Sequence, residues 1–263
     1  MASTTGPFTY NASLSWLPHR DPRTEGWMLT GSPVAVTIIT VTYMYFVKVG
    51  GPSYMSQRKP FNLRSYILVY NLLAALSSAF FVCRFFKLAY WDLGYTFLQD
   101  LDLRDTPANL EIVRLSWWLY VLKIFELVDT VFFVLRKKNE QVSTLHVVHH
   151  VIVAWNMWLE VTYGAQSHSM FIKCANSLVH VFMYTYYFLA ALGPAFARYL
   201  WWKKYLTKLQ ILQFVALFVH AIGMAVAKGN YVRLFVWLEA AEAALFFVWF
   251  LAFYFSAYKK PQP

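Results

Sequence analysis

Charged residues and cysteines are scarce in this chain of 263 residues. Only 14% of its residues are charged, and 59% are apolar. Ordinary soluble domains contain about 25% charged and about 45 to 50% apolar residues, and disordered chains are more polar still. The chain is therefore neither an ordinary soluble domain nor disordered. Its two cysteines, Cys83 and Cys174, lie in apolar stretches, so neither a disulfide framework nor a thiolate metal cluster is indicated.

Long apolar runs are abundant instead. Seven runs approach the length of about 20 residues that a helix needs to cross a bilayer. We expect helices, because backbone polar groups in lipid must form their hydrogen bonds within the segment. The first 27 residues are polar, so no cleavable signal peptide is expected. The sequence predicts an all-α, polytopic membrane protein with seven transmembrane helices, at residues 28–48, 65–90, 112–135, 145–163, 169–191, 209–228 and 234–256.

Basic residues gather on one side of these predicted spans. Lys and Arg number 23 against 13 Asp and Glu, and thirteen of the 23 fall on the cytosolic side if the N-terminus is luminal. Short basic loops stay cytosolic, whereas the Asn11 sequon is an acceptor only in the secretory lumen. Both observations predict a luminal segment 1–27, a membrane domain 28–256 and a cytosolic tail 257–263. Topology then explains most of the net charge of +10, and nucleic-acid binding is not expected.

Ionisable residues interrupt the third predicted span, although a charge at the centre of a bilayer costs about 2.5 to 3.5 kcal/mol on insertion scales. Lys123, Glu126 and Asp129 recur at steps of three. On a continuous helix they form a slowly drifting stripe along one side. An ion pair between Lys123 and Glu126 that serves only packing is the alternative to a functional role.

Three histidines open the fourth predicted span. His146, His149 and His150 are spaced i, i+3 and i+4, so their imidazoles share one helix face. Such a cluster is costly in a membrane unless it lines a polar site, which is the role that we expect. Other ionisable residues lie nearer the luminal ends of the spans and are expected to be structural: Glu160, His168, His220, Glu239 and Glu242.

The fifth and sixth spans repeat this polar pattern. Asn176, His180 and Tyr184 lie four residues apart on one helix face, and Gln210 and Gln213 lie three apart. The glutamines are equally suited to hydrogen bonds between helices and to substrate binding. Measured from the cytosolic ends of the spans, the polar groups reach similar depths. We therefore expect four helices to contribute to one sheltered site that opens toward the cytosol.

Four motifs carry a resemblance to the very-long-chain fatty acid elongases. They are Lys123-x-x-Glu126-x-x-Asp129-Thr130, His146-x-x-His149-His150, Asn176-x-x-x-His180-x-x-Met183-Tyr184-x-Tyr186-Tyr187 and Thr207-x-x-Gln210-x-x-Gln213. The resemblance implies a multi-pass enzyme of the endoplasmic reticulum membrane that condenses a long-chain acyl-CoA with malonyl-CoA. The products are a 3-ketoacyl-CoA, carbon dioxide and CoA. It also implies six helices around a substrate tunnel with a seventh outside, no cofactor beyond the two substrates, and the other enzymes of the elongation cycle as partners. The oligomeric state is left open, with a homodimer as one alternative.

Condensation requires an acyl carrier and stabilisation of an enolate. Neither cysteine lies in a motif, so we hypothesise that His149 or His180 takes the acyl group, while Asp129 and Glu126 orient imidazoles. The residues expected in catalysis are His146, His149, His150, His180, Asp129 and Glu126. Those expected to bind substrate are Lys123, Asn176, Tyr184, Tyr187, Gln210, Gln213, Lys204, Lys208 and Arg136. For the basic members of this set, topology alone is the alternative explanation.

Two other classes of protein compete with this interpretation. A membrane di-iron desaturase or hydroxylase also clusters histidines near the cytosolic face, but such sites use about eight ligands, and this chain has seven histidines in all. No metal site is predicted. A seven-helix receptor or carrier has the same number of spans, yet it leaves the histidine cluster beside an acid pair without a purpose.

Overall fold

Helices make up nearly all of the regular structure. The computed structural model describes residues 20–164, 166–227 and 229–258, and no strand occurs among them, so the all-α prediction is confirmed. The Asn11 sequon and residues 259–263 of the tail that was predicted to be cytosolic lie outside these residues. The α-helices are α1 (Val34–Tyr45), α2 (Gly51–Met55), α3 (Arg64–Phe85), α4 (Pro107–Phe125), α5 (Val128–Leu135), α6 (Thr144–Tyr163), α7 (Met170–Ala191), α8 (Lys203–Val226) and α9 (Arg233–Tyr258).

Short irregular helices extend or connect these elements. The π-helical turn η3 (Phe46–Gly50) joins α1 to α2, and η4 (Phe86–Asp92) prolongs α3. Three 3-10 turns are η2 (Pro22–Thr24), η5 (Asn139–Gln141) and η6 (Pro194–Tyr199). With these joins, helices lie at each of the seven predicted spans.

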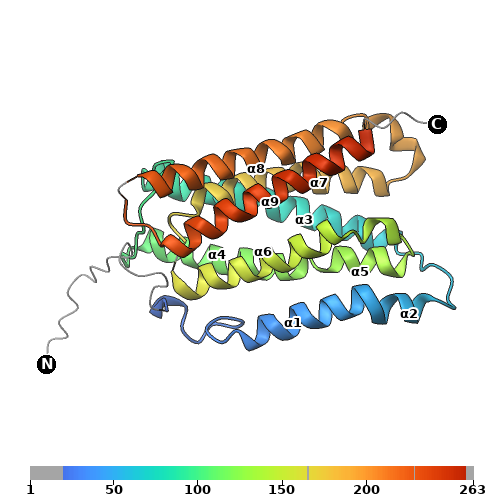
Figure 1. Ribbon diagram of the computed structural model, residues 1–263, viewed down its shortest axis with the longest axis horizontal. Helices are drawn as coiled ribbons and strands as arrows, with labels where there is room; N and C mark the ends of the chain where they lie inside the picture. The colour runs from blue at the N-terminus through green and yellow to red at the C-terminus, as the bar shows by residue number, and fades with distance from the viewer. Residues whose placement is uncertain (1–19, 165, 228, 259–263) are drawn as a thin grey trace, which may run out of the picture.

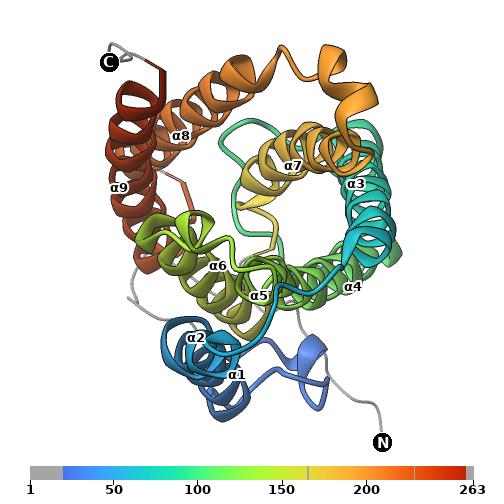
Figure 2. The same cartoon turned by 90° about the vertical axis from the view of Figure 1, so that its right-hand side faces the viewer.

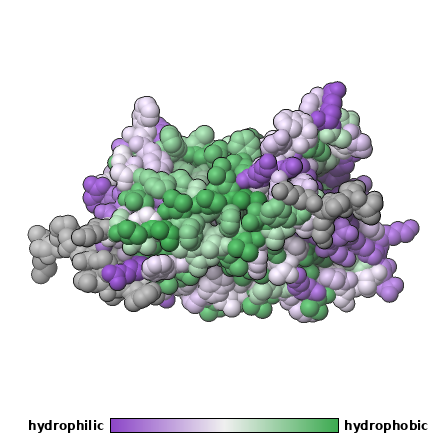
Figure 3. Space-filling view, turned by 45° about the horizontal axis from the view of Figure 1, so that its top comes forward, coloured by the Kyte–Doolittle hydropathy of each residue, from purple (hydrophilic) through white to green (hydrophobic). Residues whose placement is uncertain are grey.

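Four of these helical stretches are long and apolar enough to cross a membrane. They are Val34–Met55, Arg64–Asp92, Lys203–Val226 and Arg233–Tyr258. The other predicted spans, α4 with α5, α6 and α7, hold the clustered polar residues, and their crossing of the bilayer remains a prediction. Figure 3 shows apolar residues across the middle of the molecule and hydrophilic residues toward both ends, as a membrane protein requires.

The helices are arranged around the long axis of the molecule. Figure 1 shows them running nearly parallel to this axis. In the end view of Figure 2, α3, α4 with α5, α6, α9, α8 and α7 follow one another around a ring, with α1 and α2 outside it. Within the ring α3 packs along α7, α8 along α9, and α4 along α6. From outside, α1 packs on α6 and α2 on α5.

Local sequence signals set several helix ends. Thr106 caps α4 by accepting a hydrogen bond from the Asn109 amide, and Pro107 is the first helical residue. Helix α6 ends at its C-cap residue Gly164, which adopts the left-handed conformation with a φ of 77°. A side chain at Gly164 would also approach the Asp21 carboxylate to 3.0 Å.

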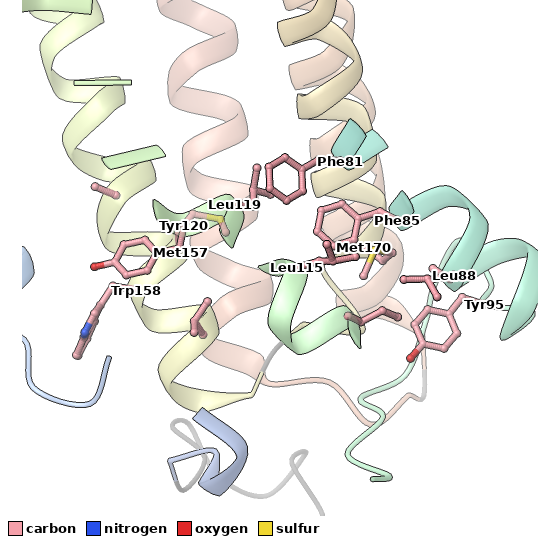
Figure 4. Close-up of a cluster of buried hydrophobic side chains, with 14 of the residues drawn as sticks. Phe81, Phe85, Leu88, Tyr95, Leu115, Leu119, Tyr120, Met157, Trp158 and Met170 are labelled. Atoms are coloured by element: carbon pink, nitrogen blue, oxygen red, sulfur yellow. The ribbon is translucent and has the colours of Figure 1, made fainter. Parts of the chain in front are cut away.

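A dense apolar cluster joins four helices toward the end that carries the α3–α4 loop. Figure 4 shows Phe85 of α3, Leu119 of α4, Trp158 of α6 and Met170 of α7 among its members. Lipid tails are as apolar as these side chains, so tight packing rather than removal from water stabilises such contacts in a bilayer. The cluster lies beside the polar site and fixes the helices that supply it.

The α3–α4 loop, residues 93–106, is tied to the ends of the neighbouring helices. The Asp102 amide donates a hydrogen bond of 2.7 Å to Ser167 Oγ, and Arg104 donates two bonds to the Asp102 carboxylate. Burial by itself favours the neutral carboxyl, but the bonds from Arg104 outweigh it and lower the pKa of Asp102 to about 2. The loop is therefore a fixed cover for this end of the bundle.

Candidate functional site

The third predicted span breaks at its charged residues. Between α4 and α5, the Leu127 amide bonds to the Ile124 carbonyl and the Asp129 amide to the Glu126 carbonyl, which is the i to i+3 pattern of a 3-10 turn. The helix expected through these residues is therefore interrupted, although all three charged side chains are buried, as a shared side requires. A 3-10 turn has three residues per turn, so side chains three positions apart eclipse one another instead of drifting.

The predicted ion pair forms and extends to a histidine of α7. Lys123 Nζ donates to both carboxylate oxygens of Glu126 at 3.0 Å, and both side chains are buried. Glu126 Oε2 lies 3.5 Å from His180 Nε2. On the other side of that imidazole, His180 Nδ1 donates to the Asn176 carbonyl at 2.9 Å. The imidazole is thus held between two acceptors, and Asn176 contributes its backbone to this contact.

Asp129 of α5 contacts α7 one helical turn beyond His180. The Tyr184 hydroxyl donates a hydrogen bond of 2.9 Å to Asp129 Oδ2, and both side chains are buried. The Tyr184 ring packs edge-on against the Tyr70 ring of α3, with centroids 6.1 Å apart. The acidic motif, Lys123-x-x-Glu126-x-x-Asp129-Thr130, therefore joins α4 and α5 to two successive turns of α7.

The histidine motif begins at a helix cap. Ser143 caps α6 by accepting a hydrogen bond from the His146 amide, which starts the helix just before the histidines. His146 Nε2 lies 2.9 Å from Thr130 Oγ1 of α5, and Thr130 Oγ1 lies 2.7 Å from the Tyr43 hydroxyl of α1. The ring of His146 also contacts that of His150 at a centroid distance of 4.4 Å.

His149 lies between His150 of the same motif and the neighbouring helix α9. Its imidazole is 5.7 Å from that of His150 and 5.0 Å from the Phe246 ring of α9, measured between centroids. It lies within electrostatic range of His180 on α7. No residue in the described part of the chain hydrogen-bonds to either ring nitrogen of His149, which is only partly buried. Its lone pair is therefore available to a bound molecule.

The fourth motif is close to the site but does not bond to the histidines. Gln210 Nε2 donates to Met183 Sδ at 3.8 Å, and Gln213 is buried without a hydrogen bond to any described residue. Tyr187 packs edge-on against Tyr184, with ring centroids 6.2 Å apart, and is partly exposed. Both glutamines thus retain amide groups for a ligand.

The basic residues expected to bind substrate form no hydrogen bond or ion pair with the described histidines. Lys204 Nζ lies 5.9 Å from the Tyr254 ring centroid, and Lys208 Nζ lies 5.4 Å from that of Tyr205. Both lysines are exposed, whereas Arg136 follows α5 and is partly buried. Among the described residues none of these three bonds to the four motifs, so topology suffices to explain their presence.

A second set of buried ion pairs lies toward the α3–α4 loop. Lys173 of α7 pairs with Glu160 of α6 and also donates to the Gln166 carbonyl at 2.9 Å. His220 of α8 lies 2.8 Å from Glu239 of α9. The Lys173–Glu160 pair joins α7 to α6, which are not neighbours in the ring, and the His220–Glu239 contact joins the neighbouring helices α8 and α9. The structural role expected for these residues stays a prediction.

Residues outside the four motifs were missed from the sequence. Tyr43, Tyr70 and Phe246 lie in long apolar runs, where an aromatic side chain gives no sign of whether it faces lipid or protein. One sequence signal could have identified Tyr43 and Tyr70: a tyrosine hydroxyl buried in an apolar span usually forms a hydrogen bond. Tyr43 has such a partner in Thr130, but Tyr45 shares this signal and is exposed.

No group of three or more His, Cys, Asp or Glu side chains within the described ranges is arranged to hold a metal ion. An ion pair, a histidine between two acceptors and a histidine with available nitrogens lie together. Such a set is able to accept an acyl group and stabilise developing negative charge.

Buried ionisable groups from several helices of an apolar bundle define an integral-membrane protein with a sheltered polar site. The profile of the ELO: GNS1/SUR4 family matches residues 28–263, and the chain belongs to this family. A very long chain fatty acid elongase of Aedes aegypti is 44% identical over 243 residues, which cover 91% of this chain and 67% of that protein. Very long chain fatty acid elongase 7 of Rattus norvegicus is 42% identical over 252 residues, covering 94% and 89% respectively. Its namesake in Drosophila melanogaster is 41% identical over 244 residues, covering 91% and 73%.

Proposed function

We propose that this protein condenses a long-chain acyl-CoA with malonyl-CoA, giving a 3-ketoacyl-CoA, carbon dioxide and CoA. Its relatives are named very long chain fatty acid elongases, and this reaction extends an acyl chain by two carbons. The observation that carries the proposal is the position of His149, with unbonded ring nitrogens, within electrostatic range of His180 and its ion pair.

The acyl group is first transferred to the enzyme. An imidazole nitrogen of His149 attacks the thioester carbonyl of acyl-CoA, the carbon–sulfur bond breaks, and the CoA thiolate leaves with the proton that the imidazole gives up. Malonyl-CoA then loses carbon dioxide, and the electron pair of the broken bond forms the enolate of acetyl-CoA. The enolate carbon attacks the acyl-imidazole, the new carbon–carbon bond forms, and the carbon–nitrogen bond to His149 breaks. The released imidazole takes up one proton from water, which replaces the proton given to the CoA thiolate.

His149 suits the nucleophile better than His180 does. The two nitrogens of His180 face a carbonyl and a carboxylate, so neither presents a free lone pair to the thioester. The cluster of His180, Glu126 and Lys123 stabilises the oxyanion in this proposal, a role for which a single donor is worth about 2.7 to 4 kcal/mol where measured. Lys123 balances the charge of Glu126 in the same cluster.

The remaining motif residues have supporting roles in this proposal. The amides of Gln210 and Gln213 donate to the thioester or enolate oxygen. The acyl chain occupies a tunnel within the ring of helices, and the phosphates of CoA meet basic groups such as Lys204, Lys208 and Arg136 at the cytosolic end. No cofactor other than the two substrates enters the reaction.

The proposed location is the endoplasmic reticulum membrane, with the N-terminus luminal and the C-terminus cytosolic. The seven crossings predicted from the sequence and the placement of its basic residues support this topology. If it is correct, Asn11 is glycosylated in cells, and Asn11→Gln removes a shift in electrophoretic mobility that glycosidase treatment also removes. Unchanged mobility of the wild-type protein after this treatment would contradict the predicted orientation.

Labelled substrates test the reaction. Purified protein is given labelled malonyl-CoA with a panel of acyl-CoAs, and the products are identified by mass. We expect 3-ketoacyl-CoA from the wild type and none from His149→Ala. With acyl-CoA alone, a hydroxylamine-sensitive adduct should form on the wild type and on the double variant Cys83→Ser/Cys174→Ser, but not on His149→Ala. An adduct that survives both His149→Ala and His180→Ala would refute the covalent route, and failure to extend any acyl-CoA would refute the function.

A further inference from the structure

Tyr43 belongs to α1, outside the ring of helices, yet its hydroxyl reaches a residue of the acidic motif. We propose that Tyr43 is a positioning residue that acts through Thr130 to set the tautomer and orientation of His146. The inference rests on the proposed function, because it gives α1 and His146 a part in that reaction. The contacts that carry it are the 2.7 Å distance from Tyr43 to Thr130 and the 2.9 Å distance from Thr130 to His146.

The surroundings leave these three groups few other partners. Tyr43 is 6% exposed and Thr130 is fully buried. Tyr43 packs in an apolar cluster with Val47, Leu127, Val134 and Val147, whose side chains offer no hydrogen bond. Polar groups in such a setting pair with each other, because an unpaired hydroxyl away from water costs free energy.

The direction of the hydrogen bonds follows from counting protons. Thr130 has one hydroxyl proton and can give it to His146 only if it accepts the proton of Tyr43. In the opposite direction, Thr130 would donate to Tyr43, whose own proton would then have no acceptor among the described residues. Both hydroxyl protons have acceptors when Tyr43 donates to Thr130 and Thr130 donates to His146 Nε2. His146 is then neutral and carries its proton on Nδ1.

The orientation of His146 is passed to its neighbours by ring contacts. Its imidazole lies 4.4 Å from that of His150, which in turn lies 5.7 Å from that of His149, the proposed nucleophile. Rotation of His146 would therefore disturb the packing on which the position of His149 depends. Through this sequence of contacts α1 influences the site without touching the substrate.

The test is Tyr43→Phe in the full-length protein, because phenylalanine keeps the ring and removes only the hydroxyl. Tyr45→Phe is the matched control, since Tyr45 lies two residues further on the same helix and is 63% exposed. Nitrogen NMR of ¹⁵N-histidine-labelled protein reports the tautomer directly. The His146 signals are those lost in His146→Gln. We expect one tautomer, protonated on Nδ1, in the wild type and in Tyr45→Phe, and a mixture in Tyr43→Phe.

Turnover supplies the second measurement. Tyr43→Phe should lower kcat roughly 2- to 10-fold, the size of effect expected from one neutral hydrogen bond, and leave the KM for acyl-CoA unchanged. Thr130→Ser should keep the wild-type spectrum and Thr130→Val should reproduce the mixture. The double variant Tyr43→Phe/Thr130→Val should be no worse than Thr130→Val alone, because both changes break one chain of bonds.

A wild-type spectrum in Tyr43→Phe would overturn the inference, and so would fully additive losses of kcat in the double variant. A purely structural role for Tyr43 would lower the melting temperature without altering the tautomer, which also counts against it. The spectra are recorded without substrates. A wild-type protein that shows the single tautomer but extends no acyl-CoA would therefore refute the proposed function while leaving the hydrogen-bond chain intact.

Discussion

The Tyr184 hydroxyl donates a hydrogen bond of 2.9 Å to the buried carboxylate of Asp129. This bond links the broken α4–α5 segment to α7 one helical turn beyond the contact between Glu126 and His180. Two polar contacts at successive levels thus fix the relative position of the two elements. The predictions that follow test what such contacts do for the fold and for the proposed reaction.

Tyr184→Phe should destabilise the protein by about 1 to 3 kcal/mol, because it leaves the buried Asp129 carboxylate without its donor. The melting temperature of the purified protein in detergent measures this effect. Tyr66→Phe is the matched control, since Tyr66 is exposed on α3 and loses no buried bond. Equal melting temperatures for the two variants would contradict the structural importance of the Tyr184 bond.

Lys123→Met should be more damaging, because Glu126 would remain buried without its partner. Breaking a buried ion pair in this way costs about 3 to 5 kcal/mol. The double variant Lys123→Met/Glu126→Leu should regain much of that stability, since apolar replacements of both partners are often neutral. It should nevertheless extend no acyl-CoA, because His180 would lose the carboxylate beside it. A stable and active double variant would show that the pair serves packing alone.

Asp102 should make the stability of the α3–α4 loop depend on pH. Its pKa is about 2 in the folded protein, below the ordinary value of 3.8. A carboxyl with a lowered pKa contributes stability that is present above about pH 4 and is lost as the pH falls toward about 2. The difference in melting temperature between wild type and Asp102→Asn should therefore shrink over this window. A difference that stays constant from about pH 5 to about pH 2 would contradict the role of the ionised carboxylate.

Gly51 should resist substitution, because its α-carbon faces α5 at close range. A β-carbon there would lie 2.6 Å from Val134 Cγ1, which is closer than atoms can approach. Gly51→Ala should destabilise the protein by about 1 to 3 kcal/mol through overpacking. Val134→Ala in the same chain should relieve this clash but not the 2.7 Å approach of the β-carbon to the Phe46 carbonyl oxygen, so it should recover only part of the loss. Gly50→Ala is the control, since its β-carbon would meet only the movable Tyr45 ring, at 3.1 Å. Similar melting temperatures for the two single variants would refute this argument.

The sequence predicted the helices and most members of the site. Apolar runs and their polar interruptions placed helices at the observed positions, and the i, i+3, i+4 spacing of the histidines placed their rings in contact. The pairing of Lys123 with Glu126 followed from spacing alone. These features depend on local periodicity, which can be read from a single chain.

The features that escaped prediction depend on tertiary packing. No glycine or proline at Glu126 and Leu127 indicates the 3-10 turn in the sequence. Contacts with His180 and Tyr184 of α7 stabilise it instead. Tyr43 was missed because α1 has apolar residues around its whole circumference, so its sequence does not show which face meets the protein. Hydrophobic patterns lose this information in a bilayer, where lipid and protein surroundings are equally apolar.

The broken α4–α5 segment has a consequence for biosynthesis. It leaves the ribosome before α7, and at that time Glu126 lacks His180 and Asp129 lacks Tyr184. Ionisable side chains without these partners make release of the segment into lipid unfavourable. If the segment crosses the bilayer, we expect the insertion machinery to retain it until α7 has been synthesised. A nascent chain truncated before Met170 should then be recognised as unassembled and degraded, because it lacks the contacts that build the polar site.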